Sequence, residues 1–321
     1  MILIKLLLFL LRPLTLVGSR LGLSTDDKVS INDLLYGLLM VSGNDAAIAL
    51  SEATSGSMDN FVSLMNKKAV SLGLNSSHFV TPHGLDEDEH FTTAFELAKI
   101  SDYALQNEIF SKIVKTSNYS VNINGRQKNL HNTNELLGSL DGVYGVKTGF
   151  TNGANRCLVT SCKRNDLDII CVVLGCDTKK DRSMDSVKLI NYIFSNYSLV
   201  NINDIIENGF SNWFKFQTGA ININKGNFTK LNLNLDSSQI PFTKIAVKND
   251  SIKDIYTDID FSYNFTAPLE KDSVIGVLNF YIDNTKYFSV NIVNSNFIER
   301  KSVIFYLNNF FENYFDFFST V

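Results

Sequence analysis

The sequence lacks several features that point to particular classes of protein. It has no long run of like charges and its net charge is −4, so it offers no basic surface for DNA or RNA. It has no internal repeat, and its N-terminal apolar run is too short to span a bilayer comfortably. His78, His90 and His131 do not show metal-ligand spacing, so no zinc site is predicted.

The composition is that of an ordinary folded protein, with 45% apolar and 19% charged residues in a chain long enough for two domains. Helical patterns occupy Asp59–Leu72 and Thr93–Leu105. Beyond a boundary near Ser198–Asp204, alternating runs such as Leu231–Leu235 and Tyr281–Val293 predict the hairpins of an all-β module.

A polar triplet, Ser42-Gly43-Asn44, interrupts the apolar stretch Leu38–Leu50. The apolar residues on both sides predict a helix, a short break and a second helix. Asn44 or Asp45 is a candidate N-cap for a helix over Ala46–Ser51. Taken alone, the triplet is therefore either a cap or part of a site.

A second polar triplet, Lys147-Thr148-Gly149, follows alternating apolar residues that begin at Gly142. This pattern predicts a strand edge, where glycine lets a ligand's backbone approach closely. Cys157–Cys162 and Ile169–Leu174 follow across a polar turn, so we predict an antiparallel meander. A single lysine in a strand is usually only solvated. The Lys147–Gly149 triplet therefore indicates a functional site only in combination with the Ser42–Asn44 triplet.

Together the two triplets resemble two of the three signatures of the serine penicillin-recognising enzymes. Asp33–Leu50, Thr81–Asp86 with Phe91–Ala94, and Gly145–Thr151 resemble the D-alanyl-D-alanine carboxypeptidases among the low-molecular-mass penicillin-binding proteins.

The resemblance implies an α+β fold with a penicillin-binding, serine β-lactamase-like domain made of an antiparallel sheet with helices. The expected organisation is an unmatched apolar N-terminus at 1–17, an incomplete carboxypeptidase (transpeptidase-like) domain at 18–199, a small β-sandwich domain at 200–300 and an amphipathic helical tail at 301–321.

The chemistry implied by the resemblance is acyl transfer through a serine ester, in which a stem peptide of peptidoglycan loses its terminal D-alanine. Ser42 then passes protons to the leaving amine, and Asn44 holds the peptide amide. Lys147 places positive charge near the substrate carboxylate and, as a catalytic residue, helps Ser42 stay in the right protonation state, while Thr148 hydrogen-bonds the carboxylate. The strand that continues through Gly149 and Thr151 pairs with an extended peptide. The family needs no metal or cofactor.

The nucleophile of the family, a serine in a Ser-x-x-Lys motif, has no counterpart in this sequence, because no lysine has a serine three residues before it. The nearest patterns, Thr25–Lys28 and Thr160–Lys163, start with threonine and lie in a polar turn and a predicted strand. By pattern, the missing helix falls before residue 1, so we expect an N-terminally truncated family member without turnover. Met1–Pro13 resembles the start of a signal peptide, but Arg12-Pro13 interrupts it and no cleavage site follows.

Other candidate residues receive simpler interpretations. The Pro and Gly around His83 predict a tight loop that this residue shapes. Phe150 stands where some relatives carry a polar residue, which affects substrate preference. Arg156 and Arg182 lie near predicted strand ends, and we expect them on a solvated face rather than beside the substrate carboxylate.

The four cysteines show a mirror arrangement. If the turn centres between residues 166 and 167, Cys162 lies opposite Cys171 and Cys157 lies opposite Cys176. Cross-strand cysteines can form disulfides, but buried thiols that only pack are more frequent in strands. We therefore expect free thiols.

The tail at 302–318, wound as a helix, separates Asn and acidic side chains from an aromatic face. It can dock on the β module or lie on a membrane, and its aromatic content, its terminal position and the habit of the family favour the membrane. Its polar face is acidic, so only Arg300 and Lys301 favour anionic lipid.

Three hypotheses of function remain: a carboxypeptidase of peptidoglycan biosynthesis that is impaired as this chain, a nonenzymatic remnant that binds wall peptides or a partner, and a β-lactamase-like hydrolase. β-Lactams become partners if a nucleophile is supplied. The family implies the extracytoplasmic face of a bacterial cell membrane.

Overall fold

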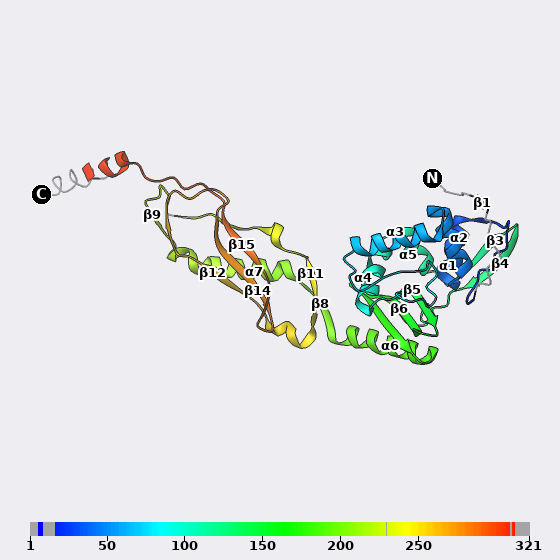
Figure 1. The fold of residues 1–321 in the computed structure, drawn as a ribbon. Helices are drawn as coiled ribbons and strands as arrows, with labels where there is room; N and C mark the ends of the chain where they lie inside the picture. Colours follow the sequence, from blue (N-terminus) through cyan, green and yellow to red (C-terminus); the bar gives the residue numbers. More distant parts are fainter. Residues whose placement is uncertain (1–5, 9–16, 229, 309, 312–321) are drawn as a thin grey trace. The chain divides into compact units, whose positions relative to one another are not determined.

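The structure is a computed structural model that describes residues 6–8, 17–228, 230–308 and 310–311. The chain divides into two compact units, Met1–Ser195 and Asn196–Val321 (Figure 1). This division falls a few residues before the boundary that the sequence predicted at Ser198–Asp204. Each unit has buried apolar clusters of its own.

The first unit combines helices with two antiparallel sheets, as the predicted α+β class requires. Its strands are β1 (Leu6–Leu8), β2 (Lys28–Ser30), β3 (Asn118–Ile123), β4 (Arg126–His131), β5 (Val143–Thr151), β6 (Asn155–Arg164) and β7 (Leu167–Cys176). Its helices are α1 (Ile31–Val41), α2 (Asn44–Ser55), α3 (Met58–Ser71), α4 (Ala94–Leu105), α5 (Glu108–Val114) and α6 (Lys179–Asn196). Helices α3 and α4 confirm the two helical patterns.

Strands β5, β6 and β7 form the predicted antiparallel meander, with β5 at one edge. Within the described ranges β5 pairs only with β6, and Lys147 lies opposite Val159 in this pairing. The strand edge expected for Lys147-Thr148-Gly149 is thereby confirmed.

Helix α1 begins where Ser30 accepts a hydrogen bond from the Asp33 N–H, a side-chain N-cap. Its apolar face, which includes Leu34 and Met40, is fully buried beside Leu21 in the main cluster of the first unit. This cluster also takes in residues of β2, β3 and β4, so α1 is fixed against that sheet.

The buried Asp45 carboxylate holds the segment before α1 against the start of α2. Its Oδ1 accepts from the N–H groups of Leu21 at 2.7 Å and Ala46 at 2.9 Å. Its Oδ2 accepts from Gly22 at 2.7 Å and Leu23 at 2.9 Å. The N-cap predicted at Asn44 or Asp45 is wrong, because α2 begins at Asn44 after a Gly43 cap without a side-chain bond.

The cysteines are free thiols, and the register that was predicted for them is wrong. The turn between β6 and β7 is Asn165-Asp166, so Cys162 lies opposite Ile169 and Cys171 lies opposite Thr160. Asn165 has a φ of 51°, a left-handed conformation that asparagine tolerates better than most residues. Cys157 follows Arg156, which lies opposite Cys176.

The second unit is a β domain with one long helix. Its main sheet has the order β10-β15-β14-β12, with smaller pairs β11-β8 and β13-β9. Its elements are β8 (Tyr197–Asn201), α7 (Ile202–Gln217), β9 (Asn222–Asn224), β10 (Leu233–Leu235), β11 (Lys244–Lys248), β12 (Ile255–Phe261), β13 (Asn264–Thr266), β14 (Val274–Ile282) and β15 (Thr285–Asn294). The expectation of an all-β module missed α7, whose apolar face packs in the clusters of this unit.

The tail is helical at residues 303–308 and 310–311. Its remaining residues, Asn309 and 312–321, lie outside the described part of the chain, and so does most of the apolar N-terminus. Across the described residues, no helix is both long and apolar enough to cross a membrane.

The four hydrogen bonds of Asp45 lead to a test of stability. Asp45→Asn replaces an acceptor by an NH2 group that faces N–H donors, so we expect the free energy of unfolding to fall by about 2–4 kcal/mol. Asp59→Asn makes the same change at an exposed position in the first turn of α3 and should cost no more than about 1 kcal/mol. Urea unfolding of both variants measures the difference, and equal losses would contradict the anchoring role of Asp45.

Candidate active site

Ser42 lies at the C-terminal end of α1 in a left-handed conformation, with φ 58° and ψ 40°. Its N–H donates to the Gly37 carbonyl, and the Gly43 N–H donates to the same oxygen at 3.0 Å. A serine in this conformation is unfavourable by about 1–2 kcal/mol, which the packing of α1 and α2 offsets. The two helices therefore fix the half-buried Ser42 at a sharp break.

Asn44 is buried at the first position of α2. Its side-chain Nδ2 donates to the Val17 carbonyl at 2.8 Å, and its backbone N–H donates to the Ser19 carbonyl at 2.9 Å. The amide group of Asn44 is thus tied to the segment that precedes β2, and its Nδ2 is already engaged.

Lys147 lies on β5 with a half-buried side chain whose Nζ donates to the Thr148 carbonyl at 2.8 Å. Burial, together with the positive charge of Arg182, lowers the pKa of Lys147 from 10.5 to about 8. Lys147 is therefore not a freely solvated lysine, because its burial makes the charged form less favourable.

Thr133 joins the end of α1 to β5. Its N–H and hydroxyl both approach the Met40 carbonyl, at 3.1 and 3.2 Å, and its Oγ1 lies 2.7 Å from the Thr148 Oγ1. Met40 is two residues before Ser42, so one residue brings the two predicted triplets to neighbouring positions.

The residues on both sides of Thr133 make further bonds to the same region. The Asn132 side chain donates to the Thr116 carbonyl at 3.0 Å, and the Asn134 Nδ2 donates to the Gly145 carbonyl of β5 at 3.0 Å. We call Asn132–Glu135 the connecting loop. Sequence analysis did not single out this loop, although its polar run directly before β5 was a visible signal.

Arg182, near the start of α6, is buried, with 3% of its side chain exposed. Its Nη2 lies 3.0 Å from Oε2 of Glu135 in the connecting loop, and the Ser183 hydroxyl donates to the same oxygen at 2.8 Å. The prediction that Arg182 lies on a solvated face is wrong, because an ion pair with a residue 47 positions away accompanies its burial.

Arg156 is half-buried, and its guanidinium stacks on Phe150, with 3.6 Å between its central carbon and the ring centroid. Gly149, opposite Cys157, is exposed on β5. The exposed Phe150 and the Arg156 guanidinium stacked on it therefore lie just beyond the Lys147–Gly149 triplet.

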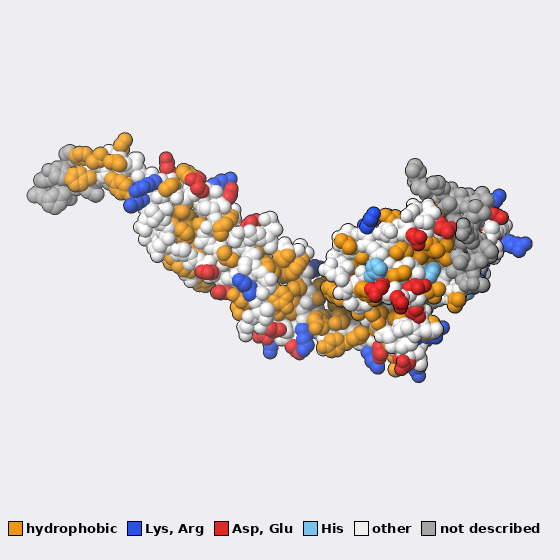
Figure 2. Space-filling model, viewed as in Figure 1, with side chains coloured by type: hydrophobic (Ala, Val, Ile, Leu, Met, Phe, Trp, Pro, Cys, Tyr) orange, Lys and Arg blue, Asp and Glu red, His pale blue; other side chains and the backbone are white. Residues whose placement is uncertain are grey.

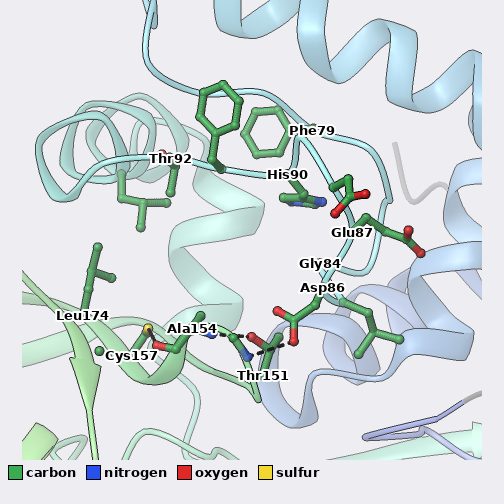
Figure 3. A pocket seen from close by; sticks show the side chains of 16 residues that line it. Phe79, Gly84, Asp86, Glu87, His90, Thr92, Thr151, Ala154, Cys157 and Leu174 are labelled. Carbon is green, nitrogen blue, oxygen red and sulfur yellow. Dashed lines mark hydrogen bonds between the residues drawn. The ribbon is translucent and has the colours of Figure 1, made fainter.

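Thr151 is the last residue of β5, three positions after Thr148. It lines a cavity of about 880 Å³ between the β5–β6 hairpin and the loop that carries Asp86 and His90 (Figure 3). The Asp86 carboxylate accepts from the Gly153 N–H at 2.9 Å, and its bond with the Thr151 side chain lowers its pKa. Thr151 thus shares β5 with Lys147, Thr148 and Gly149, and it also lines this cavity.

Acidic and histidine side chains gather on one face of the first unit (Figure 2). Burial lowers the pKa of His83 and His90, so both favour the neutral form. His83 Nδ1 accepts from the Leu85 N–H at 3.3 Å within the loop, as its loop-shaping role predicts. Among the described residues, no group of three or more His, Cys, Asp or Glu side chains is arranged to hold a metal ion.

Comparison with known proteins assigns both units. Residues 15–178 match the family model described as D-alanyl-D-alanine carboxypeptidase, and residues 216–300 match the model of the penicillin-binding protein 5 C-terminal domain. The chain therefore belongs to the D-alanyl-D-alanine carboxypeptidase family, whose members are serine hydrolases of the penicillin-binding class.

Individual relatives agree with this assignment. The D-alanyl-D-alanine carboxypeptidase DacF of Bacillus subtilis is 32% identical over 263 residues, which are 81% of this chain and 64% of the relative. DacA of Haemophilus influenzae is 32% identical over 86% of this chain and 67% of its own length. The crystal structure of penicillin-binding protein 5 from Haemophilus influenzae matches with a TM-score of 0.65 and 28% identity, covering 88% of this chain and 78% of that one.

The low pKa of Lys147 predicts an unusual titration. In side-chain NMR spectra, we expect the Lys147 amine to titrate near pH 8 rather than near the unperturbed lysine value of 10.5. Arg182→Gln removes the repelling charge and should raise the Lys147 midpoint.

The same shift affects stability. Because the folded-state pKa is the lower one, the unfolded chain binds more protons between about pH 8 and 10.5, and Lys147 makes the free energy of unfolding rise with pH in that window. A Lys147 midpoint near 10.5 would contradict this effect of its burial.

Proposed function

We propose that this chain binds the D-alanyl-D-alanine end of a peptidoglycan stem peptide and that the chain alone does not release the terminal D-alanine. Membership of the carboxypeptidase family supports the ligand. The observation that carries the proposal is the Thr133 bridge, which fixes the end of α1 beside Thr148 of β5.

The terminal carboxylate of the peptide is the anchor of the proposed complex. Lys147 supplies an ammonium group and Thr148 supplies a hydroxyl donor. The buried Arg182 adds positive electrostatic potential. A carboxylate near Lys147 favours the charged form of the lysine, so binding raises the pKa that burial lowers and Lys147 takes up a proton.

The backbone of the peptide pairs with β5 in the proposed complex. This strand lies at the edge of the described sheet, and its amide and carbonyl groups suit an extended peptide added as a further strand. Ser42 then faces the leaving amine. Because Asn44 Nδ2 is held by Val17, its Oδ1 is the atom we assign to the peptide N–H.

The sequence supports the proposed absence of turnover. Covalent catalysis in this family starts at the serine of a Ser-x-x-Lys motif, and the 321 residues contain no such motif. Binding groups without the nucleophile leave only a small part of an enzyme's rate enhancement. The same argument excludes covalent labelling by β-lactams unless a serine is supplied from elsewhere.

A pentapeptide that ends in D-Ala-D-Ala tests the proposal with the full chain. We expect saturable binding in an NMR titration, no release of D-alanine and no covalent labelling by a fluorescent penicillin. Lys147→Met should weaken binding by about tenfold or more, since it removes a charge-assisted contact.

Lys163→Met on the neighbouring strand β6 is the matched control, because it removes an exposed lysine outside the proposed contacts. Its affinity should equal that of the unchanged chain. Appreciable D-alanine release would refute the lack of turnover, and equal effects of the two substitutions would refute the role of Lys147.

We also propose that the tail, residues 301–321, attaches the chain to the extracytoplasmic face of the cell membrane. Hydrophobic side chains cover its described helical part (Figure 2). The large exposed ones are Val303, Ile304, Phe305, Tyr306, Leu307, Phe310 and Phe311. Arg300 and Lys301 precede them and favour an anionic surface.

Vesicle sedimentation tests this attachment. Removal of residues 302–321 should lower partitioning onto vesicles that contain anionic lipid by at least about tenfold. Replacement of Phe310 and Phe311 by serine should lower it in the full chain, whereas Asn308→Ser should not. Unchanged partitioning after the truncation would place the attachment elsewhere.

A further inference from the structure

Lys147 and Arg182 are the two cations of the proposed contact with the peptide carboxylate. Glu135 is an acidic side chain that pairs with Arg182. Arg182 is close enough to lower the pKa of Lys147, and its side chain is 3% exposed. Glu135, which is 46% exposed, is the acidic side chain in ion-pair contact with Arg182, at 3.0 Å. Arg182 therefore contacts a negative group of the same chemical kind as the ligand that the site is proposed to bind.

The guanidinium of Arg182 is incompletely satisfied. Its Nε is buried and has no hydrogen-bond partner among the described residues. A buried cation with one partly exposed carboxylate recovers only part of its desolvation cost, so a second anion nearby is favourable. We therefore expect the incompletely satisfied guanidinium to favour a ligand carboxylate nearby.

Glu135 is held in place by more than the ion pair. The Ser183 hydroxyl donates to its Oε2 at 2.8 Å, so one oxygen accepts from two donors of α6. Glu135 is also two residues from Thr133. Thr133 contacts Thr148, whose hydroxyl is proposed to donate to the peptide carboxylate. Its carboxylate is therefore paired with Arg182, the cation that adds positive potential to the proposed peptide site, and two like charges at one cation repel each other.

We propose that Glu135 is a built-in competitor for the carboxylate of the peptide and determines how strongly this chain prefers free carboxyl ends. The incoming carboxylate either displaces Glu135 toward solvent, which its partial exposure allows, or binds against its charge. In both cases Glu135 lowers affinity for carboxylate-ended peptides and leaves affinity for amide-ended peptides unchanged. This inference rests on the proposed peptide binding.

The test compares a D-Ala-D-Ala peptide with its C-terminal amide on the full chain. Glu135→Gln keeps an oxygen that accepts from Arg182 and Ser183 but removes the charge. We expect it to raise affinity for the carboxylate peptide about tenfold and to change affinity for the amide less than twofold. Glu207→Gln, which removes one exposed acidic charge from the second unit, should change neither affinity.

A double-mutant cycle identifies the partner. In an Arg182→Gln background, Glu135→Gln should change affinity less than twofold, because the cation for which the two carboxylates compete is gone. Glu135→Asp, which keeps the charge, should stay within about threefold of the unchanged chain. Circular dichroism of each variant checks that the fold is retained.

Each outcome separates this inference from the proposed function. If the unchanged chain binds the carboxylate peptide and Glu135→Gln binds it equally well, the competitor role is overturned and peptide binding stands. If only Glu135→Gln binds, competition is supported and peptide binding by the natural chain is overturned. If neither binds, both are overturned.

Discussion

The arrangement of the candidate site depends on the hydrogen bonds of the connecting loop, Asn132–Glu135. Thr133 holds the end of α1 and contacts Thr148, Asn134 holds β5, and Glu135 holds α6. Elements that are remote in sequence thus share one short segment. Hydrogen bonds of this kind contribute only about 1 kcal/mol each, so their importance lies in fixing positions rather than in overall stability.

Positive charge buried near β5 explains the chemistry of this region. Lys147 and Arg182 are both withdrawn from water, and their mutual repulsion adds to the cost. The sheet and α6 maintain this unfavourable pair, so the site is prepared for an anion before one arrives. We propose that this preparation serves recognition of a peptide end, as distinct from the bond-breaking step, for which the family uses the serine of a Ser-x-x-Lys motif that is missing from these 321 residues.

The sequence predicted what local patterns determine and missed what distant contacts determine. Apolar spacing located α3, α4 and the edge position of Lys147. The burial of Arg182 depends on Glu135, 47 residues earlier, and no periodicity records that pairing. Two other errors had visible signals: Asn165-Asp166 is a typical two-residue turn, and the apolar residues of Ile202–Gln217 recur with helical spacing.

The outer edge of β5 can promote self-association as well as bind a peptide. Among the described residues β5 has one strand partner, β6, so its other edge can pair with an extended chain, including the strand of a second copy. The exposed Phe150 adds an apolar contact at the same edge. A bound wall peptide would therefore protect the protein from self-association, and solubility during purification would depend on whether this edge is occupied.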